Sequence, residues 1–326
     1  MDSAFGSAAG QITPRGAPAR FIKVRAFLRM GRTNYWENWL GTLLCWSMVA
    51  RVFAFEPRTQ LLLITTLVAS AAAVATGGIL DDLQGFRDGS DLINYQKSDP
   101  TGLRPMTLKP LLLGWVSERE AIAYAKLAAV LTLILSLTAW FEAGMRPAWV
   151  LPVGAIFIFA AAQYSFGIKI SYRGAQEPGL GLLFFGTVFL PYALITGRVS
   201  GSATAQAIVW ATWFIAASVF SNSHDSTGDR HAGRRTIAAV ADETWNHRFI
   251  VAVIVSSWLA IVVPVLAGWL DRWFLVPLIV VAGLQLVQLR VGISKHDYLR
   301  ARQIGFQVMR IGVLAFVITN IVTRWT

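Results

Sequence analysis

The sequence predicts an all-α membrane protein with about nine transmembrane helices. Two features of the composition carry this prediction: 55% of the 326 residues are hydrophobic, and only 14% are charged. A soluble globular domain carries about 25% charged residues, so this chain lacks the polar side chains to cover a soluble fold. Its single cysteine excludes a disulfide framework and a cysteine-rich metal site.

The predicted helices follow from the lengths of the apolar segments. A transmembrane helix needs about 20 mostly apolar residues. In chain order, the segments of this kind are 36–55, 60–80, 121–141, 148–166, 179–197, 203–220, 249–268, 273–289 and 304–322. The segment 273–289 is the shortest, and 304–322 contains one basic residue, Arg310, for which the sequence shows no partner.

The basic residues lie mainly on one side of the predicted membrane. With the N-terminus inside, 21 Lys and Arg residues fall in the tail and inside loops, and five fall in the outside segments. Because cytoplasmic loops carry an excess of Lys and Arg, this bias predicts a multi-pass protein of the cell (plasma) membrane with a cytoplasmic N-terminus. The net charge of +11 then reflects these loops, and we expect no nucleic-acid partner.

The chain divides into a tail and one domain. We expect residues 1–31 to be a disordered cytoplasmic tail and residues 32–326 to form a single transmembrane domain. Two inside loops, 81–120 and 221–248, are long. Loops of this length are uncommon in compact proteins and are usually functional or disordered, so we place the functional site on the cytoplasmic side.

Half of the acidic residues form two clusters within these loops. The clusters are Asp81, Asp82, Asp88, Asp91 and Asp99 in the first loop, and Asp225, Asp229, Asp242 and Glu243 in the second. Asp225 and Asp229 are four positions apart, and Asp81 and Asp88 are seven apart, so each pair would share a helix face. Such charges repel and are costly near a bilayer, whereas Mg²⁺ bound to carboxylates and substrate phosphates removes the penalty. The alternative is that they are solvated loop charges paired with nearby Arg residues.

Basic residues are interleaved with the acidic clusters. They are Lys97, Arg104 and Lys109, then Lys169 and Arg173, then Arg230, Arg234 and Arg235. Carboxylates and basic groups in one cavity suit a metal-bridged diphosphate, with Lys and Arg on the remaining oxygens. The alternative for each basic residue is ordinary anchoring at the cytoplasmic membrane face.

Two motifs resemble a known family. Residues 225–236 read Asp225-x-x-x-Asp229-x-x-x-Gly233-x-x-Thr236, which resembles the second aspartate motif, D-x-x-x-D-x-x-x-G-x-x-T, of the UbiA superfamily of intramembrane prenyltransferases. The run 164–177, followed by 184–186, is similar to the Y-S…Y-R-G-x-x-E…F-F-G run of the 1,4-dihydroxy-2-naphthoate polyprenyltransferases of the menaquinone pathway. The resemblance covers about residues 30–322 and implies a UbiA-like bundle with an active-site cap on the cytoplasmic side.

The first aspartate motif departs from the pattern of that branch, which is N-D-x-x-D followed by G-x-D. Asp82 and Asp91 match it, but Asp81 stands at the Asn position and Gly85 stands at the position of the third carboxylate. Asp88 is our candidate for the missing ligand.

The resemblance implies Mg²⁺-dependent transfer of a prenyl group from a polyprenyl diphosphate to a carbon of a small aromatic acceptor in the lipid bilayer. The implied metal ligands are Asp81, Asp82, Asp88, Asp91, Asp225 and Asp229, of which Asp82, Asp88, Asp225 and Asp229 are also the catalytic candidates. The implied substrate-binding residues are Lys97, Arg104, Tyr164, Lys169, Tyr172, Arg173, Asn222, Arg230 and Arg235. The rings of Tyr164 and Tyr172 would shelter an allylic cation, or would instead anchor the chain at the membrane interface.

Two other functions fit parts of the pattern. A terpene cyclase on the same scaffold would ionise the diphosphate without an acceptor, and the altered first motif is compatible with it. A secondary transporter also uses charged residues between helices, but here the carboxylates gather at one membrane face and no inverted repeat is evident. Diphosphate release, acceptor use and coupled ion uptake separate the three functions.

Overall fold

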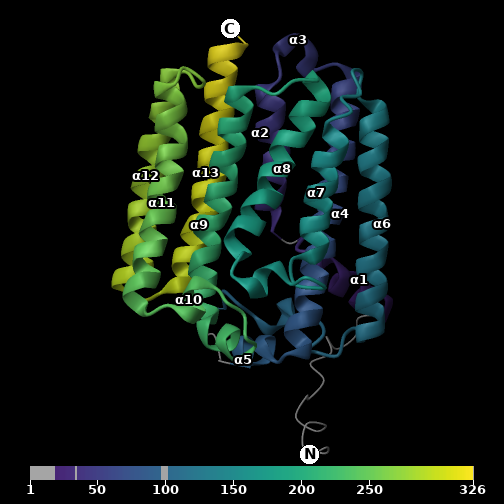
Figure 1. The fold of residues 1–326 in the computed structure, drawn as a ribbon, viewed down its shortest axis with the longest axis vertical. Helices are drawn as coiled ribbons and strands as arrows, with labels where there is room; N and C mark the ends of the chain where they lie inside the picture. The colour runs from purple at the N-terminus through teal and green to yellow at the C-terminus, as the bar shows by residue number, and fades with distance from the viewer. Residues whose placement is uncertain (1–18, 34, 97–101, 326) are drawn as a thin grey trace, which may run out of the picture.

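The computed structural model describes residues 19–33, 35–96 and 102–325, and within these ranges every regular element is helical. The long helices lie roughly side by side along the longest axis of the molecule (Figure 1). The predicted all-α fold is confirmed.

Seven helical segments within the described ranges are long and apolar enough to cross a membrane. They are α4 (Pro57–Arg87), α6 (Glu118–Glu142), α8 (Gln176–Thr196), α9 (Gly201–His231), α11 (Glu243–Leu266), α12 (Leu275–Leu289) with its flanking turns η4 (Arg272–Phe274) and η5 (Arg290–Ser294), and α13 (Tyr298–Arg324). Each coincides with one of the nine predicted segments. The remaining two segments, 148–166 and 36–55, are helical but shorter.

The segment 148–166 forms one apolar helix, α7 (Val150–Gln163), and the segment 36–55 is interrupted. The interrupted segment comprises η1 (Trp36–Trp39), α2 (Leu40–Met48) and α3 (Arg51–Ala54). Val49 adopts an extended conformation that ends α2. The indole N–H of Trp46 donates to the Ala54 carbonyl, 3.2 Å away, so side chains satisfy backbone groups freed by the interruption.

Part of the expected disordered tail is an ordered helix. The helix α1 (Ala19–Met30) packs against α4, with Ala26 and Met30 fully buried. The apolar side chains at these positions join a core cluster with Ile79 of α4 and Ala121 of α6. The expectation of disorder is therefore wrong for residues 19–30, because these apolar side chains find partners, and residues 1–18 lie outside the described residues.

The two acidic clusters begin on helices and not in loops. The helix α4 continues past Asp81 and Asp82 to Arg87, and α9 continues past Asp225 and Asp229 to His231. Shorter helices follow each extension, namely α5 (Ser90–Gln96), η2 (Met106–Leu108) and α10 (Ile237–Val240), while η3 (Ile170–Arg173) links α7 and α8. Helices α1, α5 and α10 lie at one end of the bundle, and the C-terminal end of α13 lies at the other end (Figure 1).

The centre of the bundle is α9, which packs against α8, α11 and α13. Its Trp210, Trp213 and Phe220 side chains are fully buried. Trp213 contacts Phe316 of α13 edge to face, with ring centroids 5.3 Å apart. This packing holds the acidic end of α9 in place.

The structure supplies the partner of Arg310. Its guanidinium forms an ion pair with the buried carboxylate of Glu37 and lies 4.6 Å from the centroid of the Trp36 ring. The charge within α13 is therefore paired with the segment that precedes α2.

Candidate active site

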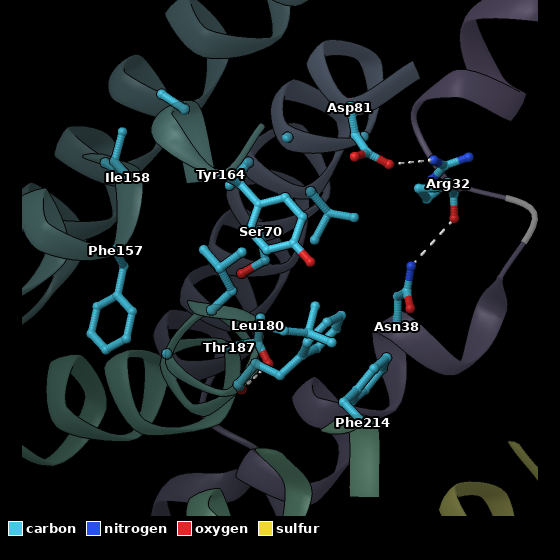
Figure 2. A pocket seen from close by; sticks show the side chains of 18 of the residues that line it. Arg32, Asn38, Ser70, Asp81, Phe157, Ile158, Tyr164, Leu180, Thr187 and Phe214 are labelled. Carbon is cyan, nitrogen blue, oxygen red and sulfur yellow. Dashed lines mark hydrogen bonds and ion pairs between the residues drawn. The ribbon is translucent and has the colours of Figure 1, made fainter. Parts of the chain in front are cut away.

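A cavity of about 720 Å³ opens among α4, α6, α7, α8, α9 and α13. One end is lined by charged side chains and the rest mainly by apolar ones. In Figure 2 the ring of Tyr164 lies between the Asp81–Arg32 pair and the apolar side chains of Leu180 and Phe214. The cavity can therefore hold a molecule with an anionic head and an apolar tail.

The apolar part follows one face of α4. The α4 residues that line it are Thr66, Ala69, Ser70, Ala73, Val74, Gly77, Gly78 and Asp81. Their spacing of three and four keeps them on one face, and their small side chains leave room beside the helix. The 15 positions from Thr66 to Asp81 correspond to about 22 Å at 1.5 Å per residue. Trp140 of α6 and Leu194 of α8 line the cavity as well.

Asp81 and Asp82 both bind Arg32 but differ in their other partners and in their access to the cavity. Asp81 lines the cavity and accepts hydrogen bonds from Ser165 at 2.7 Å and Arg234 at 2.9 Å. Asp82 is buried outside the cavity lining, and its Oδ1 accepts from both Arg32 and Lys109, each at 2.7 Å. Asp81 is therefore exposed to a ligand, whereas Asp82 forms the support behind it.

Lys109 joins the two halves of the first motif. Its Nζ lies 2.7 Å from Oδ1 of Asp82 and 2.7 Å from Oδ1 of Asp91. Burial alone would lower the pKa of Lys109, but these carboxylates outweigh burial and hold the pKa well above its usual value. The lysine is therefore charged at neutral pH.

Asp88 ends α4 and lies outside the cavity lining. It accepts hydrogen bonds from Ser90, through the backbone N at 3.0 Å and the hydroxyl at 2.7 Å, and from the hydroxyl of Tyr172. Burial would raise the pKa of Asp88, but the bonds from Tyr172 and Ser90 outweigh it and hold the pKa below its usual value. The carboxylate thus positions Tyr172 and the turn after α4, and it does not join Asp81 at the cavity.

The second motif has a local structural explanation. Gly233 has φ +71°, a left-handed conformation that suits glycine and turns the chain after α9. The turn brings Arg234 and Thr236 back to Asp229. The Thr236 hydroxyl donates to Asp229 Oδ2 at 3.4 Å, and Arg234 Nε lies 3.9 Å from Asp229 Oδ1. Thr236 also caps α10 by accepting from the backbone N–H of Ala239.

Asp225 and Arg104 form a two-pronged ion pair. Arg104 Nη2 lies 2.7 Å from Asp225 Oδ2, and Nη1 bonds the other carboxylate oxygen. Arg104 also lies over the ring of Tyr95, 4.4 Å from its centroid. Both members of the pair line the cavity, so the segment after α5 closes over the end of α9.

Arg234 connects the two acidic clusters. It donates to Asp81 on α4 and lies beside Asp229 after α9, and its guanidinium is 4.7 Å from the centroid of the Tyr172 ring. Arg234 and Lys109 were among the interleaved basic residues expected near a diphosphate, but neither was assigned as a substrate-binding residue, and Arg32 was not singled out. The available signal for Arg234 was its place inside the second motif, between Gly233 and Thr236.

Only some of the predicted substrate-binding residues line the cavity. Arg104, Tyr164 and Asn222 line the cavity. Tyr172 and Lys169 lie behind it, with the Lys169 Nζ 5.2 Å from the Tyr172 ring centroid. Arg173, Arg230 and Arg235 are exposed and lie outside the lining, and Lys97 falls outside the described residues. Arg230 donates to the Ala239 carbonyl at 3.0 Å and so supports α10.

Asn222 links the run after α7 to the second motif. It accepts from Gln176 at 2.7 Å and donates to Glu177 at 2.9 Å, and all three side chains are buried. Because Gln176 and Glu177 begin α8, these bonds hold the start of α8 against α9 one turn before Asp225. This network fixes the direction from which the carboxylates face the cavity.

The residues present fit a hard divalent cation at the second cluster. Asp225 and Asp229 are four apart on α9 and both line the cavity. Each carboxylate oxygen has two acceptor positions, so Asp225 retains sites beyond those that Arg104 occupies. Carboxylate oxygens together with substrate phosphates are the usual ligands of Mg²⁺.

Comparison with known proteins gives the same family for most of the chain. The family model described as the UbiA prenyltransferase family matches residues 40–311. No curated protein matches the sequence significantly.

Solved structures of similar fold span nearly the whole chain. A digeranylgeranylglyceryl phosphate synthase is 14% identical with a TM-score of 0.63, covering 92% of this chain and 99% of its own. A UbiA homolog from Archaeoglobus fulgidus bound to DMAPP and Mg²⁺ is 14% identical with a TM-score of 0.59, covering 89% and 98%. An apo UbiA homolog from Aeropyrum pernix K1 is 16% identical with a TM-score of 0.59, covering 91% and 98%. At these identities the likeness shows a shared fold.

Proposed function

The chain belongs to the UbiA prenyltransferase family, and from this premise we propose that it transfers a prenyl group from a polyprenyl diphosphate to a carbon of a small aromatic acceptor, with Mg²⁺ as cofactor. The observation that carries the proposal is the cavity. Carboxylates and basic side chains from both motifs surround one end of it, and an apolar trough continues from that end. This is the shape and polarity of a prenyl diphosphate.

The charged end would receive the diphosphate. Arg32, Arg104 and Arg234 line it and carry guanidinium groups that match phosphate oxygens. Asp225 and Asp229 would hold Mg²⁺, which neutralises the diphosphate and makes it a better leaving group. Two solved structures of a UbiA homolog from Archaeoglobus fulgidus are bound to DMAPP or GPP together with Mg²⁺, which supports the same pairing here.

The apolar trough would hold the prenyl chain, with Tyr164 at the junction. Its ring lies between the charged end and the apolar side chains, so it would lie beside the carbon next to the diphosphate (Figure 2). Loss of diphosphate leaves positive charge on that carbon, and the face of an aromatic ring stabilises such charge. Tyr164 would thus protect the allylic cation until the acceptor carbon attacks.

Arg302 of α13 supports an acidic aromatic acceptor. It lines the cavity, is buried, and donates to the Tyr35 hydroxyl at 2.9 Å. Among the described residues, it contacts this hydroxyl and the rings of Tyr35 and Phe306, none of which is acidic. A carboxylate on the acceptor would complete the pairing, with its ring near Tyr35 and Phe306. The Lys and Arg bias of the loops supports a cytoplasmic site in the plasma membrane.

The test is diphosphate release by the purified protein in nanodiscs. The donors are geranyl, farnesyl and geranylgeranyl diphosphates, each with Mg²⁺ or EDTA and with or without aromatic acids, and Asp225→Asn is the control. Release that needs Mg²⁺ and an aromatic acid, with a prenylated product, is the expected result. Release without acceptor, yielding a cyclic hydrocarbon, would establish a terpene cyclase instead. No release with any donor would refute the proposal and would favour a secondary transporter.

A further inference from the structure

The first acidic cluster already contains a bound cation, the ammonium of Lys109. Its Nζ makes equal contacts of 2.7 Å with Asp82 and Asp91, and its side chain is only 5% exposed. Two carboxylates that share one cation between them are the arrangement expected at a divalent metal ion. Here a buried side chain of the same protein fills that position.

Gly85 explains how Asp91 reaches this position. A Cβ atom at residue 85 would lie 2.7 Å from Cγ of Asp91, so the Asp91 carboxylate occupies the space of a side chain at residue 85. Residue 85 is the position at which the N-D-x-x-D motif, which the first cluster resembles, has its third carboxylate. Compared with a cluster of three carboxylates and no lysine, this cluster has one negative charge fewer and one positive charge more. The difference equals the charge of one divalent cation.

Asp82 is closed to any ion in the cavity. Its Oδ1 accepts from both Arg32 and Lys109, which uses both acceptor positions of that oxygen. Its Oδ2 is buried with no hydrogen-bond partner among the described residues, and Asp82 does not line the cavity. A metal ion at this point would have to displace Lys109. Asp81 and Asp91 line the cavity, as Asp225 and Asp229 of the second cluster do, but Lys109 already occupies Asp91. Among the described residues, only the first cluster has two carboxylates joined by one ammonium group.

We propose that Lys109 replaces one divalent cation, so that this protein binds its diphosphate with a single metal ion held by Asp225 and Asp229. The inference rests on the proposed function, since it concerns how the same site neutralises a diphosphate. Lys109 is a positioning residue here: it holds Asp82 and Asp91 together and supplies positive charge at the cavity lining, where Asp81 also lies.

The test counts metal ions directly, by native mass spectrometry of the full chain with MnCl₂ and geranyl S-thiolodiphosphate, an unreactive donor analogue. Glu243, His247 and His296 place ligand atoms within 4.8 Å of one another on the described surface. All proteins therefore carry His296→Ala, so that this group does not add a second ion. The parent is expected to bind one Mn²⁺ per analogue.

Lys109→Ala is expected to bind two Mn²⁺, because the second ion would take the place between Asp82 and Asp91. Lys109→Arg keeps the positive charge and is expected to stay at one, and Asp225→Asn is expected to bind none. Two ions in the parent, or one ion in a folded Lys109→Ala protein, would overturn the inference.

The numbers of Mn²⁺ ions bound by the parent and by Lys109→Arg test the single-metal inference even if Lys109→Ala does not fold. A parent that turns over donor yet holds two ions would refute this inference alone. Failure to bind the analogue at all would refute the proposed function and the inference with it.

Discussion

Replacing Ala73 with Phe places a ring halfway along the apolar trough of the cavity. Ala73 lies on the lining face of α4, eight positions from Asp81, and Thr66 lies 15 positions from Asp81. At 1.5 Å per residue these separations are about 12 Å and about 22 Å. With carbon–carbon bonds of about 1.5 Å, one four-bond isoprene repeat extends about 5 Å. The native trough therefore holds about four repeats, and the variant about two.

The expected effect is a change in donor length preference. The two excluded repeats lose their wall contacts, each carbon contact being worth about 0.1–0.2 kcal/mol. Ten such contacts per repeat give about 3 kcal/mol for two repeats, and contacts with lipid recover part of this. We therefore expect kcat/KM for the C20 donor to fall at least about tenfold, equivalent to about 1.4 kcal/mol. The C10 donor should change little.

The assay is prenylated product formed in nanodiscs from C10, C15 and C20 donors, compared as kcat/KM. Ala72→Phe is the matched control, because Ala72 is the neighbouring residue of α4 and does not line the cavity. If Ala73→Phe used the C20 donor within about twofold of the native protein, that result would show that the prenyl chain does not lie along α4.

Four further predictions concern single residues. Asp225→Asn should lower diphosphate release about 100-fold or more, as EDTA should for the native protein, because several kcal/mol of charge stabilisation is lost; undiminished release would refute the metal role. Arg302→Met should raise the KM for an acidic acceptor about tenfold while leaving the donor KM unchanged, and an equal rise in both would contradict the acceptor assignment. Arg310→Met leaves Glu37 buried without its partner and should cost about 3 kcal/mol; the unfolding midpoint in detergent measures this, and the paired change Glu37→Gln with Arg310→Met should recover much of it. The pKa of Asp88 is lowered, so its charge stabilises the fold at neutral pH and this contribution disappears as pH falls through that lowered value. Asp88→Asn should therefore lower the unfolding midpoint equally at pH 8 and pH 5, and the gap should close only below the ordinary carboxyl pKa of about 4; a gap that changes between pH 8 and pH 5 would contradict this.

The second motif was predictable because its contacts are local. Asp229, Gly233 and Thr236 lie within eight positions, and a helix end followed by a glycine turn brings them together. The spacing therefore determines the neighbours. The first motif was less predictable, since its carboxylates bind partners that are distant in the chain: Asp88 accepts from Tyr172, and Asp82 accepts from Lys109.

The helix ends were misplaced for a physical reason. Apolar runs end near Leu80 and Phe220, but α4 and α9 continue for about two or three further turns. A cavity between helices lets polar residues remain helical at the membrane boundary, because their backbones stay hydrogen-bonded while their side chains face the cavity. Hydropathy measures only the apolar run.

The helical membrane fold and the second aspartate motif were predictable from the amino-acid sequence, because both depend on residues that are close in the chain. Which charges meet depends on the packing of distant segments. Lys109 reaches Asp82 across 27 positions, Arg234 reaches Asp81 across 153, and Arg310 reaches Glu37 across 273. Such pairs depend on how the helices pack, and the choice of partner is made by the need to neutralise each buried charge.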